Sequence, residues 1–194
     1  LPRDFSFRTK VYCDAPVGGS DLGGNLYVLG GGDPLLDTLD LDSLAGVVAA
    51  SGIRHIGGDI VADLSLFDTL TWGKGWMWDD EPDPDEPFIT PLSFNHATVS
   101  VGVRPGRQSG DPLACEISPA PGLFAVDNVS ETLPDGEQDS LFVTRARGAD
   151  IIVVRGTMSL SSPPETTAFS VHSPAAHFLQ ALRGRLAARG IEVG

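Results

Sequence analysis

The chain has 194 residues, of which 41% are hydrophobic and 20% charged, so it can bury a sizeable core as one large domain or two small ones. Its formal net charge of -13 disfavours nucleic acids and anionic membrane surfaces as partners, because both are negatively charged. No apolar run approaches the roughly eighteen residues of a membrane span, so we expect neither a membrane span nor a signal peptide within this sequence.

Two short strands are expected near the N-terminus. Aromatic and β-branched residues in loose alternation favour a strand over Phe5–Cys13, and a short apolar run favours another over Asn25–Leu29. The glycines Gly30–Gly32 follow the second strand, but the spacing of a dinucleotide-binding loop and the Gly-Lys-Ser/Thr of a phosphate loop are both missing. Asp33 also stands where a phosphate would have to lie, so we expect a tight structural turn.

A helix and a further strand follow. The apolar spacing predicts a helix over Leu41–Ser51, with Asp40 or Asp42 as its N-cap and Gly52 as its stop. The next segment, Ile53–Asp63, has the composition of a strand with a glycine bulge. The first part of the chain therefore predicts a mixed α/β structure.

From Ile89 onward the apolar residues recur with a period of two, which is typical of half-buried strands. Turn residues separate the apolar runs and no helical signal interrupts them. This pattern predicts a small sandwich or barrel. The expected strands are Val99–Val103, Leu113–Ile117, Leu123–Val129, Leu141–Arg145, Ile151–Met158 and a last one near Ala168–Val171.

A second helix is expected close to the C-terminus. Ser173 is placed as its N-cap, Pro174 as its first residue and Gly190 as its stop. The segment Ala187–Ile191 also echoes Ala49–Ile53, because each ends a helix, stops at a glycine and continues with an isoleucine. Two matching helix-to-strand joints indicate that both ends of the chain build one α/β layer.

The predicted fold class is therefore α/β: a small layer with a few strands and two main helices, carrying an inserted all-β domain that is sandwich-like or barrel-like. The α/β domain is expected to comprise residues 1–88 plus 168–194. The inserted β-rich domain is expected to comprise residues 89–167.

Known catalytic motifs are largely missing from the sequence. It has no Gly-x-Ser-x-Gly, no His-Glu-x-x-His and no Ser-x-x-Lys, and Ser93-Phe94-Asn95 matches Ser-x-Asn by letter only. The four histidines are scattered, so we expect no metal site and no cofactor. Cys13 and Cys115 match no metal spacing, and either one disulfide or two buried thiols would fit them.

One segment combines aromatic bulk with concentrated negative charge. Trp76 and Trp78 directly precede Asp79–Glu86, which holds six carboxylates in eight positions. The run lacks the glycine and the spacing of an EF-hand loop, and its prolines limit how tightly it can wrap a calcium ion. A solvated acidic loop is the simpler interpretation of the run; a calcium-binding β-domain is the alternative. The segment could mark a domain boundary or a rim presented to a partner.

Taken together, the motifs resemble a known family. In chain order they are Phe7-Arg8-Thr9, Gly24-Asn25-Leu26-Tyr27, Gly30-Gly31-Gly32-Asp33-Pro34, Gly57-Gly58-Asp59, Phe67-Asp68, Gly75-Trp76-Met77-Trp78-Asp79-Asp80 and Gly190-Ile191-Glu192-Val193-Gly194. Their order and spacing, over nearly the whole chain, resemble the class C low-molecular-mass penicillin-binding proteins, the serine D-alanyl-D-alanine carboxypeptidase/endopeptidase family.

In that family a long insertion interrupts the penicillin-recognising catalytic domain between Ser-x-x-Lys and Ser-x-Asn, and forms one α/β and one β-rich accessory domain. The chain resembles that insertion alone, because Ser-x-x-Lys and Lys-Thr-Gly are absent and Ser93 falls inside the accessory region. The start at Leu1-Pro2, without a methionine, also suggests a processed protein or a piece of a longer one.

The resemblance implies an accessory, non-catalytic region of a penicillin-binding D-Ala-D-Ala carboxypeptidase/endopeptidase that acts on peptidoglycan stem peptides. The parent would be a serine-type carboxypeptidase in the periplasm or otherwise outside the cytoplasm. The chain alone would have no catalytic residue and no cofactor, and its partner would be the missing catalytic domain of the same polypeptide. The alternative is a free-standing module that binds peptidoglycan or another component of the cell envelope.

The resemblance also assigns a role to two residues. In the family, the tryptophan and the aspartate of Trp-x-Trp-Asp help to form a pocket for the side-chain amine of the stem peptide. By position these residues are Trp76 and Asp79, which would bind substrate in the full-length protein. The physics is reasonable, because an indole can support an alkyl chain while a carboxylate pairs with an ammonium group.

Overall fold

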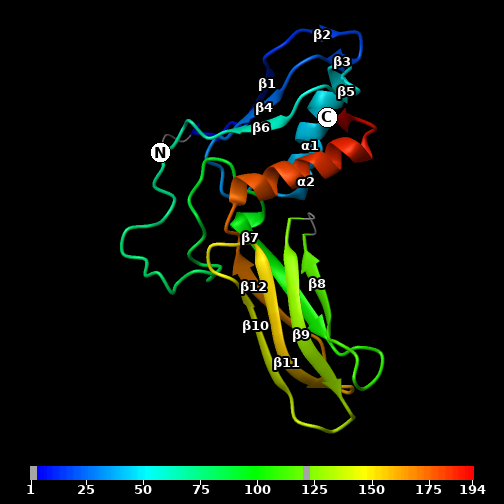
Figure 1. The fold of residues 1–194 in the computed structure, drawn as a ribbon. Coiled ribbons are helices and arrows are strands. Elements are labelled where there is room, and N and C mark those ends of the chain that lie inside the picture. Colours follow the sequence, from blue (N-terminus) through cyan, green and yellow to red (C-terminus); the bar gives the residue numbers. More distant parts are fainter. Residues whose placement is uncertain (1–3, 120–122) are drawn as a thin grey trace. The chain divides into compact units, whose positions relative to one another are not determined.

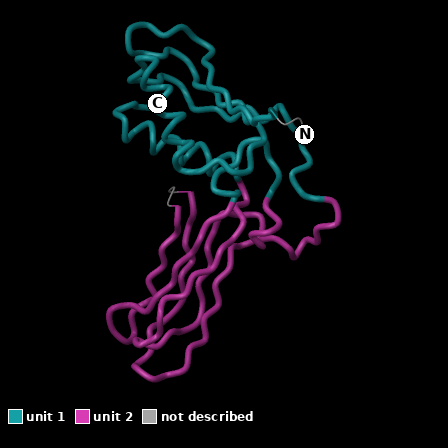
Figure 2. Tube along the Cα trace, turned by 180° about the vertical axis from the view of Figure 1, so that it is seen from behind, with its two compact units in different colours: residues 1–73, 88–97, 174–194 teal, residues 74–87, 98–173 magenta. Residues whose placement is uncertain are grey.

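The computed structural model describes residues 4–119 and 123–194. The chain divides into two compact units (Figure 2). The α/β unit comprises residues 1–73, 88–97 and 174–194, and the β-rich unit comprises residues 74–87 and 98–173. Compared with the domains expected from the sequence, the main difference is that residues 74–87 join the β-rich unit.

The α/β unit contains two helices and two small sheets (Figure 1). Helix α1 spans Thr38–Ala50, α2 spans Pro174–Ala188, and a 3-10 turn covers Asn95–Ala97. One sheet has the order β1-β4-β6 and the other the order β13-β5-β3-β2. The strands are β1 (Lys10–Cys13), β2 (Val17–Gly18), β3 (Asp21–Leu22), β4 (Leu26–Leu29), β5 (His55–Ile56), β6 (Ile60–Asp63) and β13 (Glu192–Val193).

The predicted α/β layer built from both ends of the chain is confirmed. Strand β5, which follows α1, lies parallel to β13, which follows α2, and His55 pairs with Glu192. The two helices also pack against each other, and Asp42 of α1 lies 3.8 Å from the guanidinium of Arg185 in α2 and 3.2 Å from that of Arg189, directly after α2. The repeated helix–glycine–isoleucine pattern was therefore a valid signal of shared architecture.

Three local predictions in this unit were wrong. The N-terminal strand covers Lys10–Cys13 rather than Phe5–Cys13. The N-cap of α1 is Asp37 rather than Asp40 or Asp42, because Asp37 and Asp40 form a capping box in which each side chain accepts a hydrogen bond from the other residue's backbone N–H. The segment predicted as one strand over Ile53–Asp63 forms two short strands, β5 and β6, which belong to different sheets.

The core of the α/β unit lies between the helices and the sheets. Leu41 of α1, Phe178 and Leu182 of α2, and Val28 of β4 are fully buried and belong to one apolar cluster. Burial of each such side chain contributes roughly 1.5–3 kcal/mol to folding. Because α2 supplies much of this cluster, the unit depends on a helix from the far end of the chain.

The β-rich unit consists of two three-stranded sheets with the orders β12-β7-β8 and β10-β11-β9 (Figure 1). Every strand predicted in this region is present, and the structure shows two separate sheets rather than a barrel. Neighbouring strands are antiparallel except β9 and β11, which are parallel. The strands are β7 (Thr98–Arg104), β8 (Ala114–Ser118), β9 (Ala125–Leu133), β10 (Ser140–Arg145), β11 (Ile151–Ser159) and β12 (Glu165–Ser170).

The two sheets of the β-rich unit share one apolar core, to which Val101 of β7 and Ile152 and Val154 of β11 belong. Cys115 on β8 packs against this core, and burial raises the pKa of its thiol. Cys13 and Cys115 are both free thiols, but Cys13 is exposed and Cys115 half-buried, so the alternative of two buried thiols does not hold. Within the described residues, neither helix has the length and apolar character needed to cross a membrane.

Candidate functional site

The carboxylate of Glu81 links the acidic segment of residues 74–87 to the strands and loops of the β-rich unit. Glu81 Oε1 accepts a hydrogen bond from Arg145 Nη2 at 2.6 Å and another from the backbone N–H of Gly148 at 3.1 Å. His172 Nδ1 lies 3.1 Å from the same oxygen. One carboxylate oxygen therefore joins the segment to three points of the unit, and we call this arrangement the Glu81 clamp.

The cation of the clamp is fully enclosed. Arg145 is 1% exposed, and its Nε donates to the carbonyl oxygen of Ser170 at 2.6 Å. Its Nη1 donates to the carbonyl oxygens of Ala146 and Ala149, both at 2.9 Å. A buried charge is tolerated only when it is paired and its donors are satisfied, and every nitrogen of this guanidinium has an acceptor. The clamp is thus a complete polar network.

Further contacts hold the segment on either side of Glu81. The backbone N–H of Ser170, at the end of β12, donates to the carbonyl oxygen of Pro82 at 3.0 Å. The guanidinium of Arg147 lies 4.2 Å from the centre of the Trp78 ring, a cation–π contact worth about 0.5–1 kcal/mol on an exposed surface. These contacts fix the backbone of the segment while 72% of the Trp78 surface stays exposed.

The clamp makes the stability of the β-rich unit depend on pH. Partial burial raises the pKa of Glu81, but the hydrogen bonds from Arg145 and Gly148, the charge of Arg145 and the contact with His172 outweigh it, so the pKa lies below its ordinary value of 4.5. A carboxyl whose pKa is lower in the folded state contributes stability above the unfolded pKa. That contribution is lost as the pH falls through the lowered value.

We therefore expect Glu81→Gln to flatten the acid limb of the stability curve. Urea unfolding followed by circular dichroism from about pH 6 down to about pH 3 would test this, since the loss with falling pH should be smaller in the variant. Glu86→Gln is the matched control, because desolvation and the neighbouring carboxylates raise the pKa of Glu86. Glu86→Gln should change the pH dependence of the free energy of unfolding only slightly and in the opposite direction. If both variants lost stability equally with falling pH, Glu81 would not be the group responsible.

The predicted substrate-binding residues both lie in the clamped segment. Asp79 is exposed and Trp76 is partly buried. They stand within a series of turns in which the N–H of Asp80 donates to the carbonyl oxygen of Met77 at 3.1 Å. The segment therefore presents an aromatic ring and a carboxylate three residues apart on a backbone that the Glu81 clamp holds in place.

Two other sequence motifs are not part of this segment. Ser93-Phe94-Asn95 lies in the α/β unit, where Ser93 and Phe94 are buried and the Phe94 ring packs 5.3 Å from that of His177. The acidic run does not gather into a cation site: over residues 4–119 and 123–194, no three His, Cys, Asp or Glu side chains are grouped to hold a metal ion. The calcium interpretation therefore has no geometric support in these ranges.

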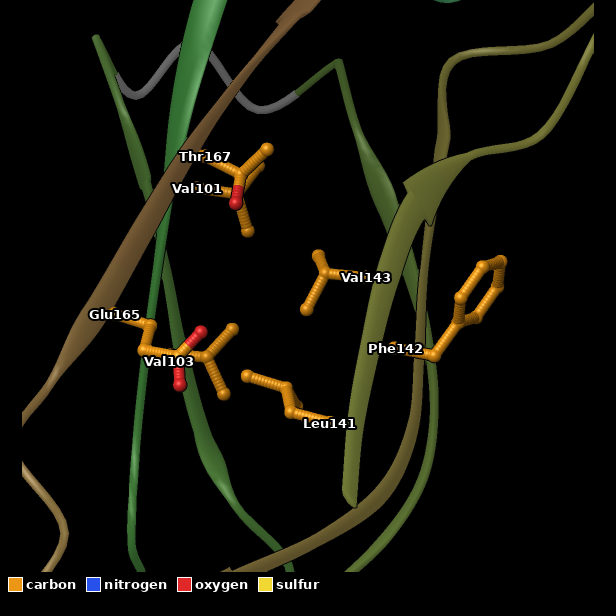
Figure 3. Close-up of a pocket in the computed structure, with 7 residues that line it drawn as sticks. All are labelled: Val101, Val103, Leu141, Phe142, Val143, Glu165 and Thr167. Carbon is orange, nitrogen blue, oxygen red and sulfur yellow. The ribbon is translucent and has the colours of Figure 1, made fainter. Parts of the chain in front are cut away.

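A cavity of about 220 Å³ opens between the two sheets of the β-rich unit, beside the edge strands β10 and β12 (Figure 3). Valine and leucine side chains of β7 and β10 face into it, whereas Phe142 points away. Glu165 and Thr167 of β12 also line it and are exposed. Polar side chains on an edge strand discourage the addition of another strand, so we interpret this cavity as the open seam of the sandwich.

Sequence reasoning missed the clamp. Glu81 is one of six carboxylates within eight positions, and its partner Arg145 lies 64 positions away in a strand predicted from its apolar neighbours. The available signal was an arginine at the end of an otherwise apolar strand pattern, because a charge at such a position needs a partner when the strand is buried. That signal gives no indication of which carboxylate pairs with the arginine.

The whole chain, residues 1–194, matches the family described as D-Ala-D-Ala carboxypeptidase 3 (S13). A D-alanyl-D-alanine carboxypeptidase of Actinomadura sp. (strain R39) is 33% identical over 182 residues, which are 91% of this chain and 34% of that protein. The D-alanyl-D-alanine carboxypeptidase DacB of Haemophilus influenzae (strain ATCC 51907 / DSM 11121 / KW20 / Rd) is 26% identical over 204 residues, with coverage of 99% and 40%. The chain thus spans well under half the length of these relatives.

Two solved structures share the fold. The crystal structure of penicillin binding protein 4 (dacB) from Haemophilus influenzae matches 98% of this chain with a TM-score of 0.81, at 22% identity and over 42% of that protein's chain. The structure of the same protein complexed with a novel beta-lactam matches 98% of this chain with a TM-score of 0.67, at 21% identity and over 39% of its chain.

Proposed function

Because the chain belongs to the D-Ala-D-Ala carboxypeptidase 3 (S13) family, we propose that it is the accessory, non-catalytic region of a penicillin-binding D-Ala-D-Ala carboxypeptidase or endopeptidase. The longer protein would act on peptidoglycan stem peptides outside the cytoplasm. Its catalytic domain, supplied by the same polypeptide, would be the partner of this chain. The observation that carries the proposal is the match of the whole chain to the family over only 34% of one relative and 40% of another.

The missing motifs support the same conclusion. The chain has no Ser-x-x-Lys to supply a nucleophile and its base, and no Lys-Thr-Gly. The one Ser-x-Asn match, at Ser93, belongs to the core side of the α/β unit rather than to an open surface. The acyl-enzyme chemistry of a serine carboxypeptidase would therefore lie in the part of the polypeptide outside these residues.

A fluorescent penicillin tests whether the reactive serine lies outside residues 1–194. The chain of residues 1–194 is expected to stay unlabelled, whereas the polypeptide encoded by the complete reading frame should form a covalent adduct that survives denaturation. Labelling of any serine in residues 1–194 would contradict the proposal. A reading frame that encodes neither Ser-x-x-Lys upstream nor Lys-Thr-Gly downstream would instead favour the free-standing binding module.

Within this function, Trp76 and Asp79 are proposed to bind the side-chain amine of the stem peptide. The exposure of Asp79 supports this role, since its carboxylate is open to a cationic group, and the Glu81 clamp holds the backbone around it. The partly buried indole of Trp76 would support the alkyl chain that carries the amine.

Asp79→Asn in the full-length protein is expected to raise KM by about tenfold for peptides with a free side-chain amine, since one charge-assisted hydrogen bond is lost. The kinetics with acetylated side chains should stay unchanged. Asp85→Asn is the matched control, because Asp85 is an exposed carboxylate of the same segment. An equal effect on amine-bearing and acetylated substrates would argue against the assignment.

A further inference from the structure

The three glycines that follow β4 mark a close crossing of chain segments in the α/β unit. A Cβ atom at Gly30 would lie 2.3 Å from the carbonyl oxygen of Pro91, and one at Gly31 would lie 2.4 Å from that of Arg8. Both distances are far below van der Waals contact, so only glycine allows the backbones to approach this closely. The glycine run therefore brings the segments around Arg8 and Pro91 together.

A further segment joins the same crossing. The ring of Phe67 lies against Gly32, with its Cζ atom 2.9 Å from the position of a Cβ there. The N–H of Gly32 donates to the carbonyl oxygen of Pro91 at 2.8 Å, and the N–H of Ile89 donates to that of Thr71 at 2.7 Å. The segments 5–8, 30–32, 64–71 and 88–91 are consequently neighbours.

These neighbouring segments carry large apolar side chains that remain exposed. Six of them, which we call the apolar surface, are between 40% and 70% exposed: Phe5, Phe7, Leu66, Phe67, Leu70 and Ile89. The rings of Phe5 and Phe7 also meet edge to face at 5.0 Å. None of the six belongs to the core cluster of the α/β unit or packs against it. Folding of the unit therefore leaves the apolar surface uncovered.

Six exposed large apolar side chains on neighbouring segments indicate a surface that a partner covers. Folded monomers rarely expose contiguous apolar patches larger than a few hundred Å², and larger ones mark contacts with proteins or membranes. An anionic membrane is disfavoured by the net charge of -13 and by Asp68, which lies on the segment 64–71. A folded protein surface without strong negative charge fits the apolar surface better.

We propose that the apolar surface docks against the catalytic part of the same polypeptide, an inference that rests on the function proposed above. The match to this chain covers 40% of one relative and 34% of another, so 60% and 66% of those proteins lie outside the match. A covalently tethered domain has a high effective concentration, so a modest apolar contact is enough to hold it. The glycine crossing then serves to assemble a docking surface from four separate segments.

Side-chain oxidation by hydroxyl radicals tests the proposal. We expect the peptides that contain Phe5, Leu66 and Leu70 to be oxidised much more slowly in the full-length protein than in the chain of residues 1–194. Val47 is the internal control, because it is 64% exposed on α1 and does not belong to the apolar surface. Its oxidation rate should be the same in both proteins.

Matched variants sharpen the experiment. Leu66→Asp combined with Leu70→Asp should restore rapid oxidation of Phe5 in the full-length protein, because a buried charge without a partner destabilises the docked state. We expect the oxidation rate of Phe5 to rise by about tenfold or more. Val47→Asp should leave the protection unchanged. The melting temperature of the 194-residue chain should not fall in the double variant, since both leucines are exposed there.

The outcomes separate this inference from the proposed function. If the full-length protein reacts with penicillin but its apolar surface is oxidised as fast as in the isolated chain, the docking proposal is wrong and the function stands. If the surface is protected but no penicillin adduct forms, the docking holds and the catalytic assignment fails. If the 194-residue chain forms a dimer that the double variant disrupts, a second copy is the occupant and the docking proposal is again wrong.

Discussion

Replacing Arg145 by methionine is expected to lower the free energy of unfolding of the β-rich unit by about 3–5 kcal/mol, the cost of breaking a buried ion pair from one side. The substitution leaves the Glu81 carboxylate, whose side chain is only 13% exposed, without its cation. It also removes the donors to the carbonyl oxygens of Ser170, Ala146 and Ala149. Urea unfolding combined with hydrogen exchange of the β10 and β12 amides would measure the loss.

Two further variants show whether the Glu81 clamp is the cause. Arg155→Met removes a surface ion pair with Asp127, in which the side chains are 37% and 52% exposed, and should cost less than about 1 kcal/mol. The pair Arg145→Met with Glu81→Leu should lose clearly less than the sum of the single changes, because no charge is left unpaired. Strict additivity would show that Glu81 and Arg145 do not act as a pair.

Gly156→Ala is expected to destabilise the β-rich unit by about 3 kcal/mol or more, a value reached when an unfavourable backbone conformation and a steric clash coincide. Gly156 has φ +92 in the middle of β11, and an added Cβ would lie 1.7 Å from the carbonyl oxygen of Ser140 in the neighbouring strand. That oxygen belongs to the backbone, so the two strands would have to separate. Thermal unfolding by calorimetry would measure the lowered melting temperature of the β-rich unit in the variant.

Gly102→Ala provides the matched control for this prediction. Gly102 also lies inside a strand, β7, but a Cβ there would come no closer than 3.8 Å to its neighbours. We expect a change within about 0.5 kcal/mol, as for a substitution that meets no clash. Equal losses in the two variants would mean that alanine in these sheets is unfavourable for a reason other than the contact with Ser140.

Sequence patterns predicted the elements well where one face is buried and the other is not. The alternation of Val99, Val101 and Val103 identified β7, and Ser173-Pro174 identified the start of α2, because both signals are local. The single strand predicted over Ile53–Asp63 failed because its two halves pair with different sheets. Long-range pairing of this kind leaves no periodic trace in the sequence.

The candidate site was less accessible to sequence reasoning. Trp76 and Asp79 were identified through a family resemblance, and their role stays a prediction. The placement of residues 74–87 was harder, because it depends on Glu81 meeting Arg145 across 64 positions. Arg145 ends an otherwise apolar strand pattern, but nothing in the sequence distinguishes Glu81 from the carboxylates near it, so only the folded contacts reveal that the acidic segment belongs to the β-rich unit.

The chain passes between the two units four times, at residues 73–74, 87–88, 97–98 and 173–174. This connectivity sets an order of folding during synthesis. The β-rich unit has all of its strands once Ser170 has left the ribosome, whereas the α/β unit still lacks α2 and β13. Domains tend to fold as soon as they are complete. The β-rich unit, although its first residue is made after that of the α/β unit, can therefore complete its folding first. Until α2 has been synthesised, the apolar faces of α1 and β4 remain exposed to solvent. During that interval the nascent chain is most prone to bind chaperones or to aggregate.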